Sequence, residues 1–111
     1  MKVWQKSHEF VLSIYGSLSS YPKEETYNLV SQIKRASTSI PANIAEGAGR
    51  FTSKDFAHFL QNALGSAHEI EYLLLLSKDL NYLNTESYIL HIQYITEIKA
   101  MLIALIKRVR S

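Results

Sequence analysis

Histidine and carboxylate side chains are the groups in this sequence that could bind a metal ion or transfer a proton. Asp55 and His58 are three residues apart, so on a helix they would share one face. Di-iron bundles carry a Glu-x-x-His pair twice, together with two further inward glutamates, and no second copy occurs here. The string His68-Glu69-Ile70-Glu71 lacks the second histidine of a His-Glu-x-x-His zinc motif. We interpret both groups as solvated charges and expect no metal and no cofactor.

Nucleophilic chemistry is not expected either. The chain has no cysteine, which removes thiolate catalysis and disulfides and fits a reducing cytoplasm. A nucleophilic serine needs a base within hydrogen-bonding reach, but Ser39 and Glu46 would lie about two helical turns apart. Gly47-Ala48-Gly49 is interpreted as a helix end with a left-handed glycine rather than as a phosphate loop, because no strand precedes it. We therefore predict no catalytic residue and no enzymatic activity.

Four segments of helical period must position any functional surface. Apolar side chains recur every three or four residues over 3–19, 23–49, 53–80 and 85–110, and no stretch alternates as a strand would. Pro41 falls inside the second segment, where the apolar spacing keeps its phase, so we predict one helix bent at Pro41. Thr52 and Thr85 are the predicted caps of the third and fourth helices.

Short connections make consecutive helices antiparallel neighbours. The predicted fold is all-α, a single antiparallel up-down-up-down four-helix bundle over residues 1–111. Trp4, Ala48 and Leu80 are among the predicted core positions. The apolar faces of the third and fourth helices are wider than one core requires, which indicates an interface; the extra residues are Leu74, Leu75, Leu76, Ile89, Ile103 and Ile106. No apolar run approaches the ~18 residues of a membrane span and no signal peptide is recognised, so we expect a cytoplasmic protein without membrane contact.

Cationic side chains are the best candidates for a binding surface, although the net charge is only +2. The candidates for nucleic-acid binding are Lys34, Arg35, Arg50, Lys54, Lys107, Arg108 and Arg110. The second and fourth helices of such a bundle end at the same end, so Arg50, Lys54 and the 107–110 segment should converge there. Repeated in an assembly of several subunits, these cations would attract phosphates and release counterions. The alternative is that they complement helix dipoles and keep the protein soluble.

Glu46 and Arg50 stand in the favourable order for an ion pair within a helix. One interpretation is a surface pair that contributes about 0.3–0.5 kcal/mol. The other is that Asn43, Glu46 and Arg50 form one polar face between subunits. A Glu46→Ala variant with unchanged assembly mass would count against the second interpretation.

The string SIPANIAEG at residues 39–47, followed by Gly49-Arg50, is distinctive. It resembles the signature of the bacterial four-helix bundle proteins encoded within 23S rRNA intervening sequences. Further similar segments are Phe59-Leu60, Gly65-Ser66, Glu69, Glu71-Tyr72-Leu73 and Leu80-Asn81-Tyr82-Leu83. With Trp4 and the segment Phe10 to Tyr15, the resemblance covers nearly the whole chain.

This resemblance implies an up-down bundle that assembles into a homopentameric ring, without an established enzymatic activity. It also implies a relation to the accessory protein of diversity-generating retroelements, which binds nucleic acid through a basic surface. The residues assigned on this basis to the family motif or to an oligomer interface are Ser39, Pro41, Asn43, Glu46, Gly47 and Arg50.

Three functions follow as hypotheses. The first is an assembling bundle that binds nucleic acid through its basic surfaces, with RNA favoured over DNA as the ligand. The second is a structural or protein-interaction module without nucleic-acid binding, and the third is an enzyme with a site between helices, although no small-molecule substrate is identified. Native mass, a salt-dependent binding assay and elemental analysis distinguish them.

Overall fold

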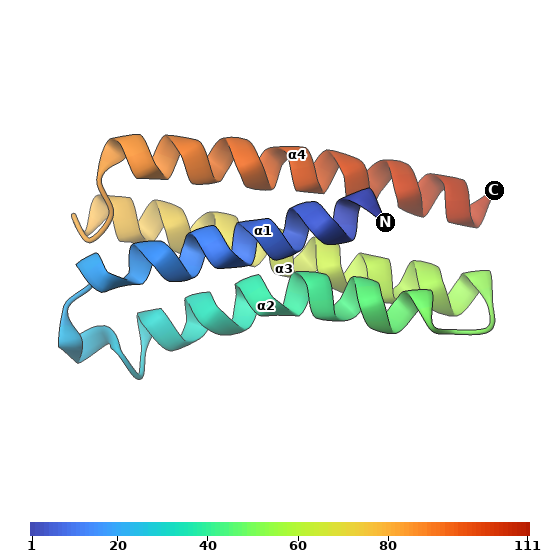
Figure 1. The fold of residues 1–111 in the computed structure, drawn as a ribbon, viewed down its shortest axis with the longest axis horizontal. Coiled ribbons are helices and arrows are strands. Elements are labelled where there is room, and N and C mark those ends of the chain that lie inside the picture. Colours follow the sequence, from blue (N-terminus) through green and yellow to red (C-terminus); the bar gives the residue numbers. More distant parts are fainter.

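The computed structural model describes all 111 residues, which form α-helices and connecting turns without any strand (Figure 1). The helices are α1 (Lys2–Ser17), α2 (Leu29–Ala48), α3 (Ser53–Asp79) and α4 (Thr85–Arg110). Two 3-10 helices, η1 (Leu18–Ser20) and η2 (Lys23–Glu25), connect α1 to α2. The predicted all-α four-helix fold is confirmed.

The four helices lie side by side in an elongated body of 44 × 24 × 18 Å. Each helix packs against the next one in sequence, and α1 also packs against α4. The chain reverses direction at every connection, so the C-terminus and the α2–α3 connection lie at one end, and the N-terminus lies in the same half of the bundle, short of that end (Figure 1). The α1–α2 and α3–α4 connections lie at the opposite end. Residues near the end of α2, the start of α3 and the end of α4 are therefore brought to one end of the molecule.

The helix boundaries follow local hydrogen bonding. Thr52 caps α3, because its hydroxyl accepts a hydrogen bond from the Asp55 backbone N–H at 3.1 Å, as predicted. The predicted cap of α4 is wrong by one residue: the side chain of Asn84, not Thr85, accepts from the Ser87 N–H at 2.8 Å. Asparagine caps helices at least as well as threonine, and this difference leaves the start of α4 unchanged.

The predicted start of α2 at Lys23 is also wrong, because regular helix begins only at Leu29. Asn28 has a non-helical backbone (φ −125°, ψ −100°), which separates α2 from η2. The Glu25 carboxylate accepts the Leu29 N–H at 3.4 Å and the Asn28 side-chain amide at 3.2 Å. Glu25 thus satisfies a free donor at the true start of α2 instead of lying inside its first turn.

A proline and two glycines occur in the second half of α2 and at its C-cap. The helix continues through Pro41, and the bend expected there stays a prediction. The left-handed glycine expected at the helix end is wrong, since Gly49 caps α2 with φ −86° and Asn81 is the only residue with positive φ. Gly47 is needed for another reason: a Cβ there would lie 2.7 Å from Cβ of Phe59. Glycine therefore allows the end of α2 to approach α3 closely.

The core is a single cluster of aliphatic side chains with few aromatic ones. Trp4 and Ala48 are exposed, and Leu80 is 43% exposed, so these three predicted core positions are wrong. In α1 the buried seam runs instead through Val3, Ser7, Phe10 and Ile14. Ser7 fits this seam because its hydroxyl donates to the Val3 carbonyl at 2.7 Å, so this buried polar group has a partner.

Some of the predicted surplus apolar residues are core and some are surface. Leu74 and Ile106 are buried, which corrects the prediction for them. Leu75, Ile89 and Ile103 are 40%, 48% and 41% exposed. α4 is long and apolar enough to cross a membrane, but the core helices of soluble proteins have the same length and composition. Only 33% of its most apolar stretch is buried in this subunit. Apolar surface therefore remains on α4 beyond what the core uses.

Candidate nucleic-acid interface

The charged side chains divide the bundle into two unlike ends. The end that holds the C-terminus and the α2–α3 connection, here the basic end, carries Arg50, Lys54, Lys107, Arg108 and Arg110 against Glu46 and Asp55, and Lys2 joins it where the start of α1 lies beside Arg108. The opposite end, here the acidic end, carries Glu24, Glu25, Asp79 and Glu86 against Lys23 and Lys78. The middle carries equal numbers of cations and anions. A net charge of +2 thus conceals a positive pole and a negative pole.

A groove between the start of α3 and the end of α4 brings two predicted cations together. It is a hollow of about 370 Å³ lined by Ser53, Lys54, Ala57, His58, Gln61, Val109 and Arg110. With the Gln61 amide oxygen facing α4, this oxygen accepts two hydrogen bonds from the Arg110 guanidinium at 3.0 and 3.1 Å. Gln61 holds Arg110 without neutralising it, so Arg110 and Lys54 present two positive charges at one opening.

Arg108 extends the basic surface to the other side of α4. It lines a shallow hollow of about 250 Å³ with Lys2 of α1, while Lys107 is exposed in the same last turn of α4. None of Lys2, Lys54, Lys107, Arg108 and Arg110 forms an ion pair within the chain. Unpaired, exposed cations are the groups that can exchange their counterions for phosphates.

Arg50 differs from these five because it is already engaged. Its guanidinium binds the Glu46 carboxylate at 2.9 Å and lies over the Phe59 ring at 4.7 Å from the centroid. The ion pair that was predicted from the spacing is present. Arg50 therefore contributes a fixed, partly neutralised charge at the edge of the basic end.

Lys34 and Arg35 lie in the middle of α2 and do not join this surface. Lys34 lies over the Tyr15 ring at 5.4 Å, and Arg35 faces Glu69 at 3.9 Å. Other charges in the middle are paired as well, with Lys99 at 2.8 Å from Glu71. The seven predicted basic residues thus separate into five at one end of the bundle and two on its flank.

Phe51 is a residue of the basic end that the sequence reasoning did not single out. It lies in the connection between α2 and α3, directly after Arg50, and its side chain is fully exposed. It neither belongs to the core cluster nor packs against it. The available signal was a large aromatic residue outside both apolar stripes, directly after Arg50 and three residues before Lys54.

The motif residues near Ser39 serve the contact between α2 and α3. The Asn43 amide donates to the Ser39 carbonyl at 2.8 Å and to the Ser39 hydroxyl at 2.9 Å. The Ser66 hydroxyl of α3 in turn donates to the Ser39 hydroxyl at 2.8 Å. Asn43 is therefore engaged inside the subunit, apart from the exposed Glu46–Arg50 pair, and Ser39 has no base beside it.

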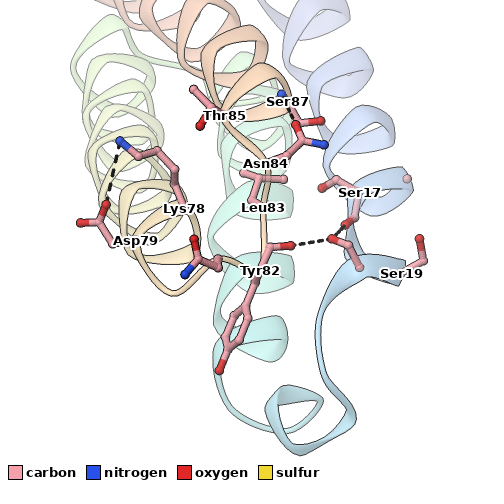
Figure 2. A pocket seen from close by; sticks show the side chains of 12 residues that line it. Ser17, Ser19, Lys78, Asp79, Tyr82, Leu83, Asn84, Thr85 and Ser87 are labelled. Atoms are coloured by element: carbon pink, nitrogen blue, oxygen red, sulfur yellow. Dashed lines mark hydrogen bonds and ion pairs between the residues drawn. The ribbon is translucent and has the colours of Figure 1, made fainter.

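The acidic end holds the larger hollow, of about 760 Å³, shown in Figure 2. Hydroxyl and amide groups from the end of α1, from η1 and from the α3–α4 turn line it. Ser20 donates to the Tyr82 carbonyl at 2.8 Å and to the Ser17 carbonyl at 3.0 Å, and Lys78 faces Asp79 at 3.9 Å. These groups bind one another across the hollow, and no cluster of three metal-ligating side chains exists anywhere in the chain.

The fold and the charge distribution define a class of protein: a four-helix bundle with one strongly cationic end. Residues 1–104 match the family model of the 23S rRNA-intervening sequence protein, and the chain belongs to that family. A crystal structure of a protein of unknown function from the S23 ribosomal protein family of Bacteroides thetaiotaomicron is 36% identical and superposes with a TM-score of 0.87, covering 95% of this chain and 98% of that one. No protein with a curated description matches the sequence.

Proposed function

We propose that this protein is a non-enzymatic bundle that assembles into a homo-oligomer and binds nucleic acid through its basic end, with RNA as the expected ligand. The observation that carries the proposal is the set of five exposed, unpaired cations at one end: Lys2, Lys54, Lys107, Arg108 and Arg110. Their charge is not needed inside the chain, whereas most charges elsewhere are paired. A nucleic-acid backbone is a ligand that such a surface attracts.

The assembly part of the proposal rests on apolar surface. Leu90 and Ile89 of α4 are 59% and 48% exposed, and Tyr72 of α3 is 58% exposed. A groove of about 360 Å³ between α3 and α4 is lined mainly by apolar side chains, among them Tyr72 and Leu75. Exposed apolar patches of this kind mark interfaces. By resemblance the oligomer is a pentameric ring, in which five basic ends would add their fields.

The family description supports the choice of RNA, because it refers to an intervening sequence of 23S rRNA. In a ring, each subunit would add its own phosphate contacts, so affinity should depend steeply on salt. We place the protein in the cytoplasm on the same grounds, since ribosomal RNA is made and used there.

The test is to measure binding of a fluorescent RNA by anisotropy at about 50 mM and about 200 mM salt, with the native mass determined in parallel. We expect an oligomer, and an affinity that falls by orders of magnitude over this range. An oligomer without any affinity at the lower salt would instead establish the second candidate function, a structural or protein-interaction module. The exposed apolar residues of α3 and α4 are the observation that favours that alternative.

A further inference from the structure

The exposed ring of Phe51 has no structural task inside the subunit. Its relative exposure is 105%, the largest among the large hydrophobic side chains of the protein. It lies in the four-residue connection between Ala48 and Ser53, outside the core and its partly buried rim. No other aromatic ring and no cation lies against it. A side chain in this state is available to a ligand.

Its surroundings indicate the chemistry of that ligand. Arg50 precedes Phe51, and Lys54 follows three residues later beside the Arg110 groove. The backbone N–H groups at the start of α3 add positive character to the same place. Glu46 and Asp55 are the two acids nearby; Glu46 is paired with Arg50, and Asp55 lies at the capped helix start. An exposed flat ring within three residues of Arg50 and Lys54 matches a ligand that has flat bases and phosphates.

Single-stranded nucleic acid presents both groups together. Its unpaired bases stack on aromatic side chains while cations follow the backbone. In duplex RNA the bases are stacked inside the helix and their faces are not available to a protein. The cations alone would bind either form, whereas the ring adds contact only with the single strand.

Tyr27 is a second highly exposed aromatic residue, in a different electrostatic setting. Its side chain is 96% exposed, but it lies at the acidic end beside Glu25 and Glu24, which would repel phosphates. The two aromatic residues are therefore matched in exposure and opposite in electrostatic setting.

We propose that Phe51 is a base-stacking residue and that the basic end consequently prefers single-stranded RNA over duplex. This inference rests on the proposed function and adds the form of the nucleic acid and the residue that selects it.

The experiment uses the full chain and compares Phe51→Ala with Tyr27→Ala. Affinity is measured by anisotropy for one RNA as a single strand and as a duplex, at the same salt. We expect Phe51→Ala to weaken single-strand binding about tenfold, within the range of one lost stacking contact, and to leave duplex binding and the salt slope unchanged. Tyr27→Ala should match the wild type on both RNAs.

Two further measurements separate stacking from other roles of Phe51. A 2-aminopurine base in the single strand should change its fluorescence on binding to the wild type and to Phe51→Tyr, but not to Phe51→Leu, because leucine is apolar without being aromatic. Native mass should be the same for all variants.

The outcomes are distinct. If the wild type binds neither RNA at about 50 mM salt, the proposed function fails and this inference fails with it. Equal affinity of the wild type and Phe51→Ala for the single strand would overturn the inference alone, as would equal losses on strand and duplex. A lower native mass for Phe51→Ala would overturn it in favour of a subunit contact.

Discussion

The two ends of the bundle close the chain in different ways. At the acidic end, η1, η2 and the α3–α4 turn bind one another: the Tyr82 hydroxyl donates to Glu25 at 3.1 Å, and the Tyr21 and Tyr82 rings lie 5.7 Å apart. At the basic end, a single short turn joins α2 to α3, and most of the surrounding charges have no partner. At the acidic end, hydrogen bonds hold the connections to one another, whereas at the basic end the connection is a single turn and five cations have no ion pair.

The largest effect is expected from removing charge at one end only. Replacing Lys54 and Arg110 with glutamine should remove two phosphate contacts, lower the salt slope by about 1.4 and weaken RNA binding about 25-fold near 0.1 M salt. The matched control replaces Lys23 and Lys78 at the acidic end and changes the net charge equally. Anisotropy titrations over several salt concentrations measure both. If the two double variants lost affinity equally, net charge would govern binding and the distinction between the ends would not hold.

The next effect concerns the backbone at each end. Gly47→Ala should destabilise the protein by about 1–2 kcal/mol, because the added Cβ meets the rigid stem of Phe59 and this overpacking exceeds the gain in helix propensity. Gly16→Ala, in α1 near the acidic end, meets no atom within 4 Å and should stabilise the protein by about 0.5–1 kcal/mol. Urea unfolding followed by circular dichroism gives both values. A stabilised Gly47→Ala variant would show that α2 and α3 can separate at the basic end without loss.

The helical period was sufficient to predict the four-helix fold and the places of α3 and α4. It failed where a polar residue or a glycine occupies a buried position. Ser7 is polar, so the apolar pattern does not indicate that it is buried; its hydrogen bond to Val3 makes burial possible. The pattern therefore predicts Trp4 on the buried face of α1 instead. The importance of Gly47 depends on the distance between two helices, which no single stretch of sequence contains.

The candidate site was also predictable only in part, because some of its contacts depend on how the helices pack. The prediction that consecutive helices are antiparallel was enough to place Lys54 near the 107–110 segment, because this requires only the order and the direction of the helices. The engagement of Arg35 by Glu69 could not be predicted, since it depends on the rotation of α2 against α3. Phe51 was not among the predicted site residues, because helical periodicity identifies only residues that lie on a face of a helix. Phe51 lies in the connection between two helices.

A titratable contact near the acidic end should make stability depend on pH. His91 of α4 is buried against Phe10 of α1, and its Nε2 lies 3.1 Å from the Ser13 hydroxyl. Burial lowers the pKa of His91 below its ordinary value of 6.5, and contacts with Ser13 and Ser87 offset part of this change. The unfolded chain therefore takes up a proton more readily than the folded one, so the stability contributed by neutral His91 is present above pH 6.5 and is lost as the pH falls below it.

Unfolding by urea at a series of pH values from about 7.5 to about 5 measures this effect. The free energy of unfolding of the wild type should decrease toward the lower pH, and His91→Gln should flatten the decrease. His58→Gln removes an exposed histidine at the basic end and is the matched control, which should keep the wild-type slope. A slope that persists in His91→Gln would assign the pH dependence to other groups.

The smallest effect tests whether the acidic end is held by its own hydrogen bonds. Tyr82→Phe removes the hydroxyl that binds Glu25 between the α3–α4 turn and η2, and should lower the free energy of unfolding slightly, because the lost hydrogen bond is accessible to water. Tyr27→Phe removes a hydroxyl without a partner in the chain and should change nothing. Both should bind RNA like the wild type, because neither touches the basic end. Reduced RNA binding in Tyr82→Phe would mean that the two ends are coupled through α3 and α4. The hydrogen bond at the acidic end would then influence RNA binding at the basic end.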